Sequence, residues 1–178
     1  MNLPNRITVA RICMVPVFVV LLLISPTYPV CRWISLLVFI VASLTDFVDG
    51  RIARSRGLVT NFGKFMDPLA DKLLVCSALI ALIPLKLIPA WVVLISVARE
   101  FVISGFRLVA AEKGIVLAAS KLAKAKTAVL MVMIIVLIAD FPFLKIPGQI
   151  LIYASLVLTI ASLTEYLMKN AHILKGEM

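Results

Sequence analysis

The sequence predicts an all-α, polytopic integral membrane protein with six transmembrane helices, and three observations lead to this fold class. Apolar residues make up 63% of the chain, only 15% of its residues are charged, and the mean hydropathy is +1.13. Soluble domains average about 45–50% apolar and about 25% charged residues. Prolines separate the apolar runs, and the charges gather at alternate ends of these runs. The polar residues are too few to cover a folded surface in water. We therefore expect the chain to be surrounded by lipid.

The elements follow from charge-free apolar runs that are bounded by proline-containing turns. The runs are the stretch after Arg11, then residues 33–45, 73–85, 87–98 and 127–139, and the stretch after Lys145. No small-residue cleavage site follows the first run, so we expect an uncleaved span there and not a targeting peptide. Extended to spanning length, the predicted helices cover about residues 7–25, 32–54, 62–84, 89–110, 122–141 and 147–168. The whole chain, 1–178, is expected to form a single membrane domain.

The charges predict the orientation in the membrane. They cluster at the start of the first, third and fifth predicted helices and at the end of the second, fourth and sixth, which is one side of an up-and-down bundle. Of the basic residues, the opposite loops hold only Arg32, Lys86 and Lys145. By the positive-inside rule the charged side is cytoplasmic, and both termini are expected there. Topology thus accounts for the net charge of +9, and no nucleic-acid partner is expected.

Several charged residues fall within the predicted spans. An ionisable side chain at that depth is costly unless it faces a partner or a polar cavity. We therefore expect the bundle to enclose a polar cavity that is open to the cytoplasm. Snorkelling to the lipid headgroups is the alternative for long cations such as Arg6, Lys169 and Lys175, but short aspartates cannot reach that far.

Cysteine and histidine contribute little to the predicted chemistry. Cys13, Cys31 and Cys76 are odd in number and lie in apolar runs, so they are interpreted as small hydrophobic residues. His172 is the only histidine. A disulfide framework, a zinc site and a Ser–His catalytic pair are therefore not expected.

Four aspartates form the most informative cluster. Asp46 and Asp49 lie near the end of the second predicted helix, and Asp67 and Asp71 lie near the start of the third. Spacings of three and four residues put each pair on one helix face. The short link makes the two helices antiparallel neighbours, so the carboxylates are expected at one depth. Oxygen ligands without His or Cys favour Mg²⁺ or Mn²⁺, and four carboxylates are enough for two ions.

Two small residues and a cation accompany these aspartates. Gly50 and Ala53 lie on the same helix face as the first aspartate pair, where they provide close helix packing, room for a bulky ligand, or both. Arg54 lies one turn beyond Gly50 and is a candidate phosphate ligand. Arg51 and Arg56 are interpreted as positive-inside charges.

The segment from Asp46 to Asp71 has the pattern D-x-x-D-G-x-x-A-R-x₈-G-x₃-D-x₃-D. Its eight fixed residues would arise by chance on the order of 10⁻¹⁰ per starting position. This segment resembles the signature of the CDP-alcohol phosphatidyltransferases. The six-helix layout with both termini in the cytoplasm is also similar to that family.

Three further segments resemble a narrower group within the family. They are residues 3–11, residues 98–101 with Arg107, and residues 124–127, although Ala123 stands where a glycine is usual. The group comprises bacterial enzymes that transfer the phosphatidyl group from CDP-diacylglycerol to sn-glycerol 3-phosphate and release CMP. The resemblance implies an enzyme of phospholipid (phosphatidylglycerol) biosynthesis in the bacterial cell membrane, a homodimer with a cytoplasmic active site.

The resemblance also implies roles for individual residues. Asp46, Asp49, Asp67 and Asp71 would hold two metal ions, Mg²⁺ or Mn²⁺, and Asp71 would be the general base; its role as a ligand only is the alternative. The residues implied to bind CDP-diacylglycerol are Asn5, Thr8, Asp46, Gly50, Ala53, Arg54 and Thr60.

A second, basic cluster is expected to bind the acceptor phosphate. It comprises Arg99, Arg107, Lys124 and Lys126. Two arginines together with lysine suit a phosphate group. A neutral acceptor such as serine would not require this cluster of cations. The alternative is an ordinary ion pair, either Arg99–Glu100 or Arg107–Glu112, with the remaining cations explained by the positive-inside rule.

Two alternative functions remain open from the sequence. The first is the same chemistry with inositol phosphate, serine or phosphatidylglycerol as acceptor. The second is a small cation channel or transporter with aspartates along its pore. The confinement of the aspartates to one side of the membrane, beside basic residues, favours the enzyme.

Overall fold

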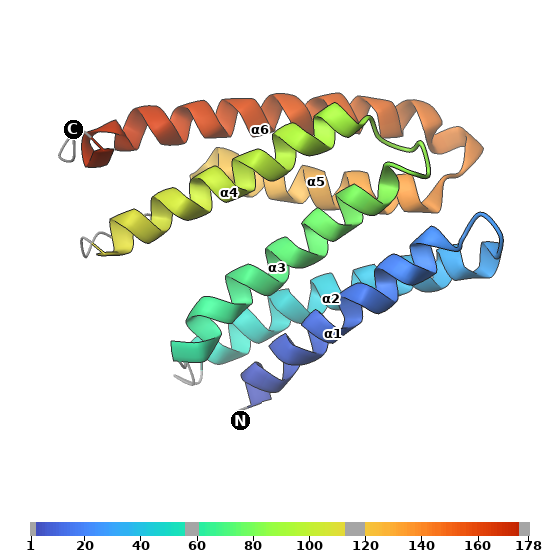
Figure 1. Ribbon diagram of the computed structural model, residues 1–178, viewed down its shortest axis with the longest axis horizontal. Helices are drawn as coiled ribbons and strands as arrows, with labels where there is room; N and C mark the ends of the chain where they lie inside the picture. The colour runs from blue at the N-terminus through green and yellow to red at the C-terminus, as the bar shows by residue number, and fades with distance from the viewer. Residues whose placement is uncertain (1–2, 56–60, 113–119, 175–178) are drawn as a thin grey trace. The chain divides into compact units, whose positions relative to one another are not determined.

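The computed structural model describes residues 3–55, 61–112 and 120–174, and within them the side chains of residues 8–45, 66, 69–112 and 120–170 (Figure 1). These residues form six α-helices and one short 3₁₀ helix, with no β-strand among them. The α-helices are α1 (Leu3–Leu23), α2 (Pro29–Ser55), α3 (Asn61–Leu82), α4 (Ala90–Glu112), α5 (Lys121–Ala139) and α6 (Lys145–Leu174). The all-α prediction is confirmed, and each predicted helix is present.

Proline explains where the first two helices begin. α1 starts at Leu3 and α2 at Pro29, each a few residues before the predicted start. Proline is accepted in the first helical turn because the N–H groups there have no partner within the helix. α1 also continues through Pro16, which removes one backbone hydrogen bond and which membrane helices tolerate.

Local capping fixes the ends of α5. The Ser120 hydroxyl accepts a hydrogen bond from the Ala123 N–H at 3.1 Å and caps the N-terminus. At the other end Asp140 adopts a left-handed φ of 46°, and its N–H donates to the Val136 carbonyl at 3.2 Å. The 3₁₀ helix η1 (Pro142–Leu144), which the sequence did not predict, then leads into α6.

The chain divides into two compact units, and the first comprises residues 1–87. Within it α1 packs against α2 and α3, and α2 also contacts α3. The rings of Phe18 and Phe39 lie 5.5 Å apart, and neither side chain is exposed. On α3, Leu74 and Ala78 are buried one turn apart. α1 therefore contacts both aspartate-bearing helices, which also contact each other.

The second unit comprises residues 88–178, and α6 is its central helix because it packs against both α4 and α5. α5 buries Leu130 and Ile134 one turn apart. Phe106 of α4 and Tyr166 of α6 meet edge to face, with ring centroids 5.8 Å apart. The single domain predicted over residues 1–178 remains a prediction.

The outward faces of the helices are strongly apolar. Leu94 is 71% exposed and Phe101 70%, which would be unfavourable in water. In the described part of the chain, Lys121–Ala139 and Pro142–Asn170 are long and apolar enough to cross a membrane. Thr8–Leu23 and Pro29–Thr45 are shorter apolar helices. This pattern is consistent with a membrane protein.

Candidate functional site

The backbone brings the four predicted aspartates onto two helices that touch. Asp46 and Asp49 lie in the second half of α2, and Asp67 and Asp71 lie in the first half of α3. The side chain of Asp71 is half-buried and has polar partners. The side chains of the other three aspartates lie outside the described residues, and among the described side chains no His, Cys, Asp and Glu cluster could hold a metal.

Helix α1 is attached to α2 close to this aspartate pair. The Arg11 side chain is buried, and its Nε donates a hydrogen bond to the Ala42 carbonyl of α2 at 3.2 Å. Ala42 precedes Asp46 by one helical turn. The sequence predicted Arg11 only as a positive-inside charge, and its presence in the family-like segment 3–11 was the available signal for a closer role.

The residues predicted to border the nucleotide lipid are described to different extents. Thr8 of α1 is buried, one turn before Arg11. Four others occupy helical backbone whose side chains lie outside the described residues, and Thr60 lies outside them altogether. Those four are Asn5 of α1 and Gly50, Ala53 and Arg54 of α2.

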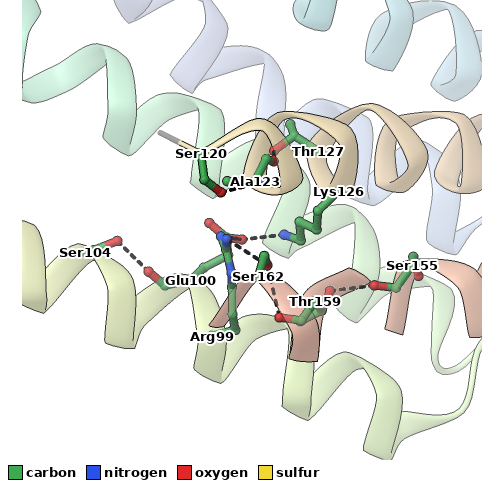
Figure 2. A network of polar contacts seen from close by, with 10 residues as sticks. All are labelled: Arg99, Glu100, Ser104, Ser120, Ala123, Lys126, Thr127, Ser155, Thr159 and Ser162. Atoms are coloured by element: carbon green, nitrogen blue, oxygen red, sulfur yellow. Dashed lines mark hydrogen bonds and ion pairs between the residues drawn. The ribbon is translucent and has the colours of Figure 1, made fainter. Parts of the chain in front are cut away.

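The predicted acceptor cluster contains a buried ionic network (Figure 2). Arg99 of α4 donates through Nη1 to Oε1 of Glu100 at 3.0 Å. Lys126 of α5 donates through Nζ to the same oxygen. Arg99 is only 6% exposed and Lys126 only 1%. One carboxylate therefore joins two of the predicted phosphate ligands.

The same network reaches the third helix of the unit. Nη2 of Arg99 donates to the Ser162 hydroxyl of α6 at 3.1 Å, and that hydroxyl donates to the Thr159 carbonyl at 3.1 Å. Nε of Arg99 is buried without a hydrogen-bond partner. The sequence missed Ser162. The available signal was a row of hydroxyl residues along one face of the apolar α6, namely Ser155, Thr159 and Ser162.

The other two predicted phosphate ligands, Arg107 and Lys124, are exposed. The alternative ion pair Arg99–Glu100 is present, whereas no ion pair joins Arg107 to Glu112 in the described part of α4. The pairing of Glu100 with Lys126 was not predicted. Whether the cluster binds an anion remains a prediction.

The two units differ in the ligands that suit them. The α2 and α3 segments carry carboxylates, which suit hard divalent cations. The network of the second unit combines two cations with one carboxylate, and Arg107 and Lys124 are exposed cations on the same two helices, α4 and α5. An excess of guanidinium and ammonium groups suits a phosphate.

Comparison with known proteins identifies the family. The family model for CDP-alcohol phosphatidyltransferase matches residues 1–161. The chain is 43% identical to the CDP-diacylglycerol–glycerol-3-phosphate 3-phosphatidyltransferase of Bacillus subtilis, over 98% of this chain and 97% of the relative. It is 39% identical to the protein of the same name from Rickettsia bellii, over 89% of this chain and 90% of the relative. Since these matches extend far beyond the aspartate motif, this chain belongs to the CDP-alcohol phosphatidyltransferase family.

Proposed function

We propose that this protein transfers the phosphatidyl group from CDP-diacylglycerol to sn-glycerol 3-phosphate, giving phosphatidylglycerophosphate and CMP. The observation that carries the proposal is the complete aspartate motif on two packed helices, in a chain that is 43% identical to a relative named for this reaction. The basic cluster on α4 and α5 supports a phosphorylated acceptor.

The four aspartates of the motif, Asp46, Asp49, Asp67 and Asp71, are proposed to hold two divalent cations. The donor set fits Mg²⁺ or Mn²⁺, because all four ligands are carboxylates and the helices that carry them pack against each other. When bound, such ions neutralise the pyrophosphate and the departing CMP and polarise the attacked phosphorus.

Asp71 is proposed to be the general base. Its carboxylate accepts the proton of the acceptor hydroxyl as that oxygen bonds to the lipid-side phosphorus, and the bond from this phosphorus to the CMP oxygen breaks. A carboxylate with an ordinary pKa of about 4 is a weak base, so its position beside the hydroxyl must compensate. The half-buried setting of this side chain, which shields it in part from bulk water, supports the role.

Residues of α1 and α2 are proposed to border CDP-diacylglycerol. The lack of bulk at Gly50 and Ala53 leaves room for the ligand against the helix backbone, and Arg54 binds phosphate. Asn5, Thr8 and Thr60 complete the nucleotide side together with Asp46. The burial of Thr8 and the attachment of Arg11 to α2 support a fixed position of α1 beside the motif.

The acceptor phosphate is proposed to bind Arg99, Arg107, Lys124 and Lys126. Arg99 and Lys126 are buried and held by Glu100, while Arg107 and Lys124 are exposed and can meet the acceptor from solution. A dianionic phosphate matches this excess of cations.

The six helices are proposed to span the bacterial cell membrane with both termini, the active site and a polar cavity on the cytoplasmic side. The distribution of charge along the sequence supports this orientation, and the apolar outer faces support the membrane location. This placement keeps CMP in water and the acyl chains in lipid. The protein is further proposed to act as a homodimer, on the resemblance to its family.

The direct test is a transfer assay with the purified protein in detergent micelles that contain CDP-diacylglycerol. Radiolabelled sn-glycerol 3-phosphate should yield a labelled lipid and an equal amount of CMP in the presence of Mg²⁺ or Mn²⁺. Chelation of divalent cations should abolish turnover, and their return should restore it. Turnover with inositol phosphate, serine or phosphatidylglycerol but not with glycerol 3-phosphate would contradict the proposed acceptor.

A further inference from the structure

We propose that Glu100 is a positioning residue of the acceptor-phosphate site. Its carboxylate holds Arg99 and Lys126 side by side at one oxygen, in the arrangement in which both can bind a phosphate. The inference rests on the proposed function, because it takes the acceptor to be phosphorylated.

The geometry of the three charged groups is the first argument. Arg99 from α4 and Lys126 from α5 both donate to Oε1 of Glu100. Two cations so close would otherwise repel each other, and their repulsion is strong where water is excluded. The shared carboxylate oxygen therefore holds the guanidinium of Arg99 and the ammonium of Lys126 close together. An oxygen of a bound phosphate would hold them in the same way.

Burial makes this carboxylate necessary. Lys126 is 1% exposed and Arg99 is 6% exposed, so neither is solvated by bulk water. A buried charge without a partner is strongly destabilising, and it relaxes by moving or by losing its charge. Glu100 therefore keeps both groups charged and in place before the acceptor arrives.

The hydrogen-bonding capacity of Arg99 is the second argument. Its Nη1 donates to Glu100 and its Nη2 to Ser162, which orients the guanidinium plane from two helices. Its Nε is buried and has no hydrogen-bond partner. A buried donor without a partner is costly, and an incoming phosphate oxygen would satisfy it.

The charge balance leaves room for the phosphate. Two cations and one carboxylate leave one net positive charge in the network, and the exposed Arg107 and Lys124 add two more. A phosphate monoester carries about −1.5 to −2 charges at pH 7. The carboxylate therefore orders the cations without cancelling their attraction for the acceptor.

The test compares steady-state kinetics of Glu100→Ala, Lys126→Met and the double variant. Each single variant should raise KM for sn-glycerol 3-phosphate by about tenfold, the factor expected for losing one hydrogen bond to a charged group, with KM for CDP-diacylglycerol unchanged within about twofold. The effect of the double variant should be smaller than the product of the two single effects, because Glu100 acts partly through Lys126 and partly through Arg99. Glu100→Gln, which keeps the oxygen, should lie between the wild type and Glu100→Ala.

Two controls keep the inference open to refutation. Glu112→Gln removes an exposed carboxylate from the same helix and should leave every constant unchanged. If Glu100→Ala does not fold, two other variants replace it in the comparison with Lys126→Met. One is Glu100→Gln. The other is the double variant, which has no buried ammonium left without a partner. An unchanged acceptor KM in Glu100→Gln and Glu100→Ala would overturn the inference. So would fully additive effects, about a hundredfold, in the double variant. Absence of wild-type turnover with glycerol 3-phosphate would instead contradict the proposed function.

Discussion

The two units of this chain differ in whether their charged residues have counter-charges within the protein. In the first, the aspartates lie towards the ends of α2 and α3, two helices that contact each other, and the buried Arg11 of α1 donates to the Ala42 carbonyl, one helical turn before Asp46. In the second, Arg99 and Lys126 carry their own counter-charge in Glu100. The acidic region is thus suited to cations supplied from solution, whereas the basic region is ordered before any ligand binds.

This difference separates two kinds of functional residue. Carboxylates that gather around metal ions are expected to be indispensable for turnover, because they act on the reacting atoms. Cations that are ordered by an internal partner are expected to govern the affinity for the acceptor, because they contact a part of it that does not react. Variants in the two regions should therefore change different kinetic constants.

The largest effect is expected for Asp71→Asn in the acidic region. The amide is nearly isosteric with the carboxylate, so folding and CDP-diacylglycerol binding should persist. Since an amide cannot accept the hydroxyl proton, kcat should fall by about 10²–10⁴-fold. The measurement is CMP release by the purified variant at saturating concentrations of both substrates.

Asp140→Asn is the matched control for this variant. It makes the same chemical change at the C-terminal end of α5, where the left-handed φ of 46° suits asparagine as well as aspartate. Its turnover should equal that of the wild type. A near-normal kcat for Asp71→Asn would show that Asp71 is not the base and would remove the distinction drawn between the two regions.

A smaller effect is expected for Arg107→Ala in the basic region. Arg107 is exposed, so its truncation should not disturb packing, and it should raise the acceptor KM about tenfold with little change in kcat. Lys121→Ala removes one exposed positive charge from the start of α5 without touching the predicted ligand set, and it should leave this KM unchanged. An increase in the CDP-diacylglycerol KM alone would assign Arg107 to the other substrate.

The same contrast explains how far the sequence could predict this molecule. The helices were predictable because proline and charge interrupt the apolar runs, and the aspartate motif was predictable because helical spacing puts its carboxylates on one face. The family-like spacing of Asp46, Asp49, Asp67 and Asp71 made these residues recognisable from the sequence alone.

The network of the second unit was less predictable because it depends on helix packing. Arg99 and Glu100 are neighbours in sequence, so their pairing could be considered from the sequence. The contact of Glu100 with Lys126 spans 26 residues, and that of Arg99 with Ser162 spans 63. No local periodicity determines which faces of α4, α5 and α6 meet. The 3₁₀ turn at Pro142–Leu144 was missed for a related reason, since proline marks an interruption without specifying its geometry.

The smallest expected effect concerns Ser120, which supports the basic region without belonging to its chemistry. Its hydroxyl caps α5 six residues before Lys126 (Figure 2). Ser120→Ala should lower the free energy of unfolding by about 1 kcal/mol and the melting temperature by about 2–4 °C, because a helix N–H loses its partner. Ser120→Asn, which restores a capping oxygen, should recover most of this loss. Because Lys126 is held by Glu100 and by packing, both variants should keep the acceptor KM within about twofold of the wild type. An acceptor KM that rises with Ser120→Ala and recovers with Ser120→Asn would mean that the cap, and not Glu100 alone, orders the cations of the second unit.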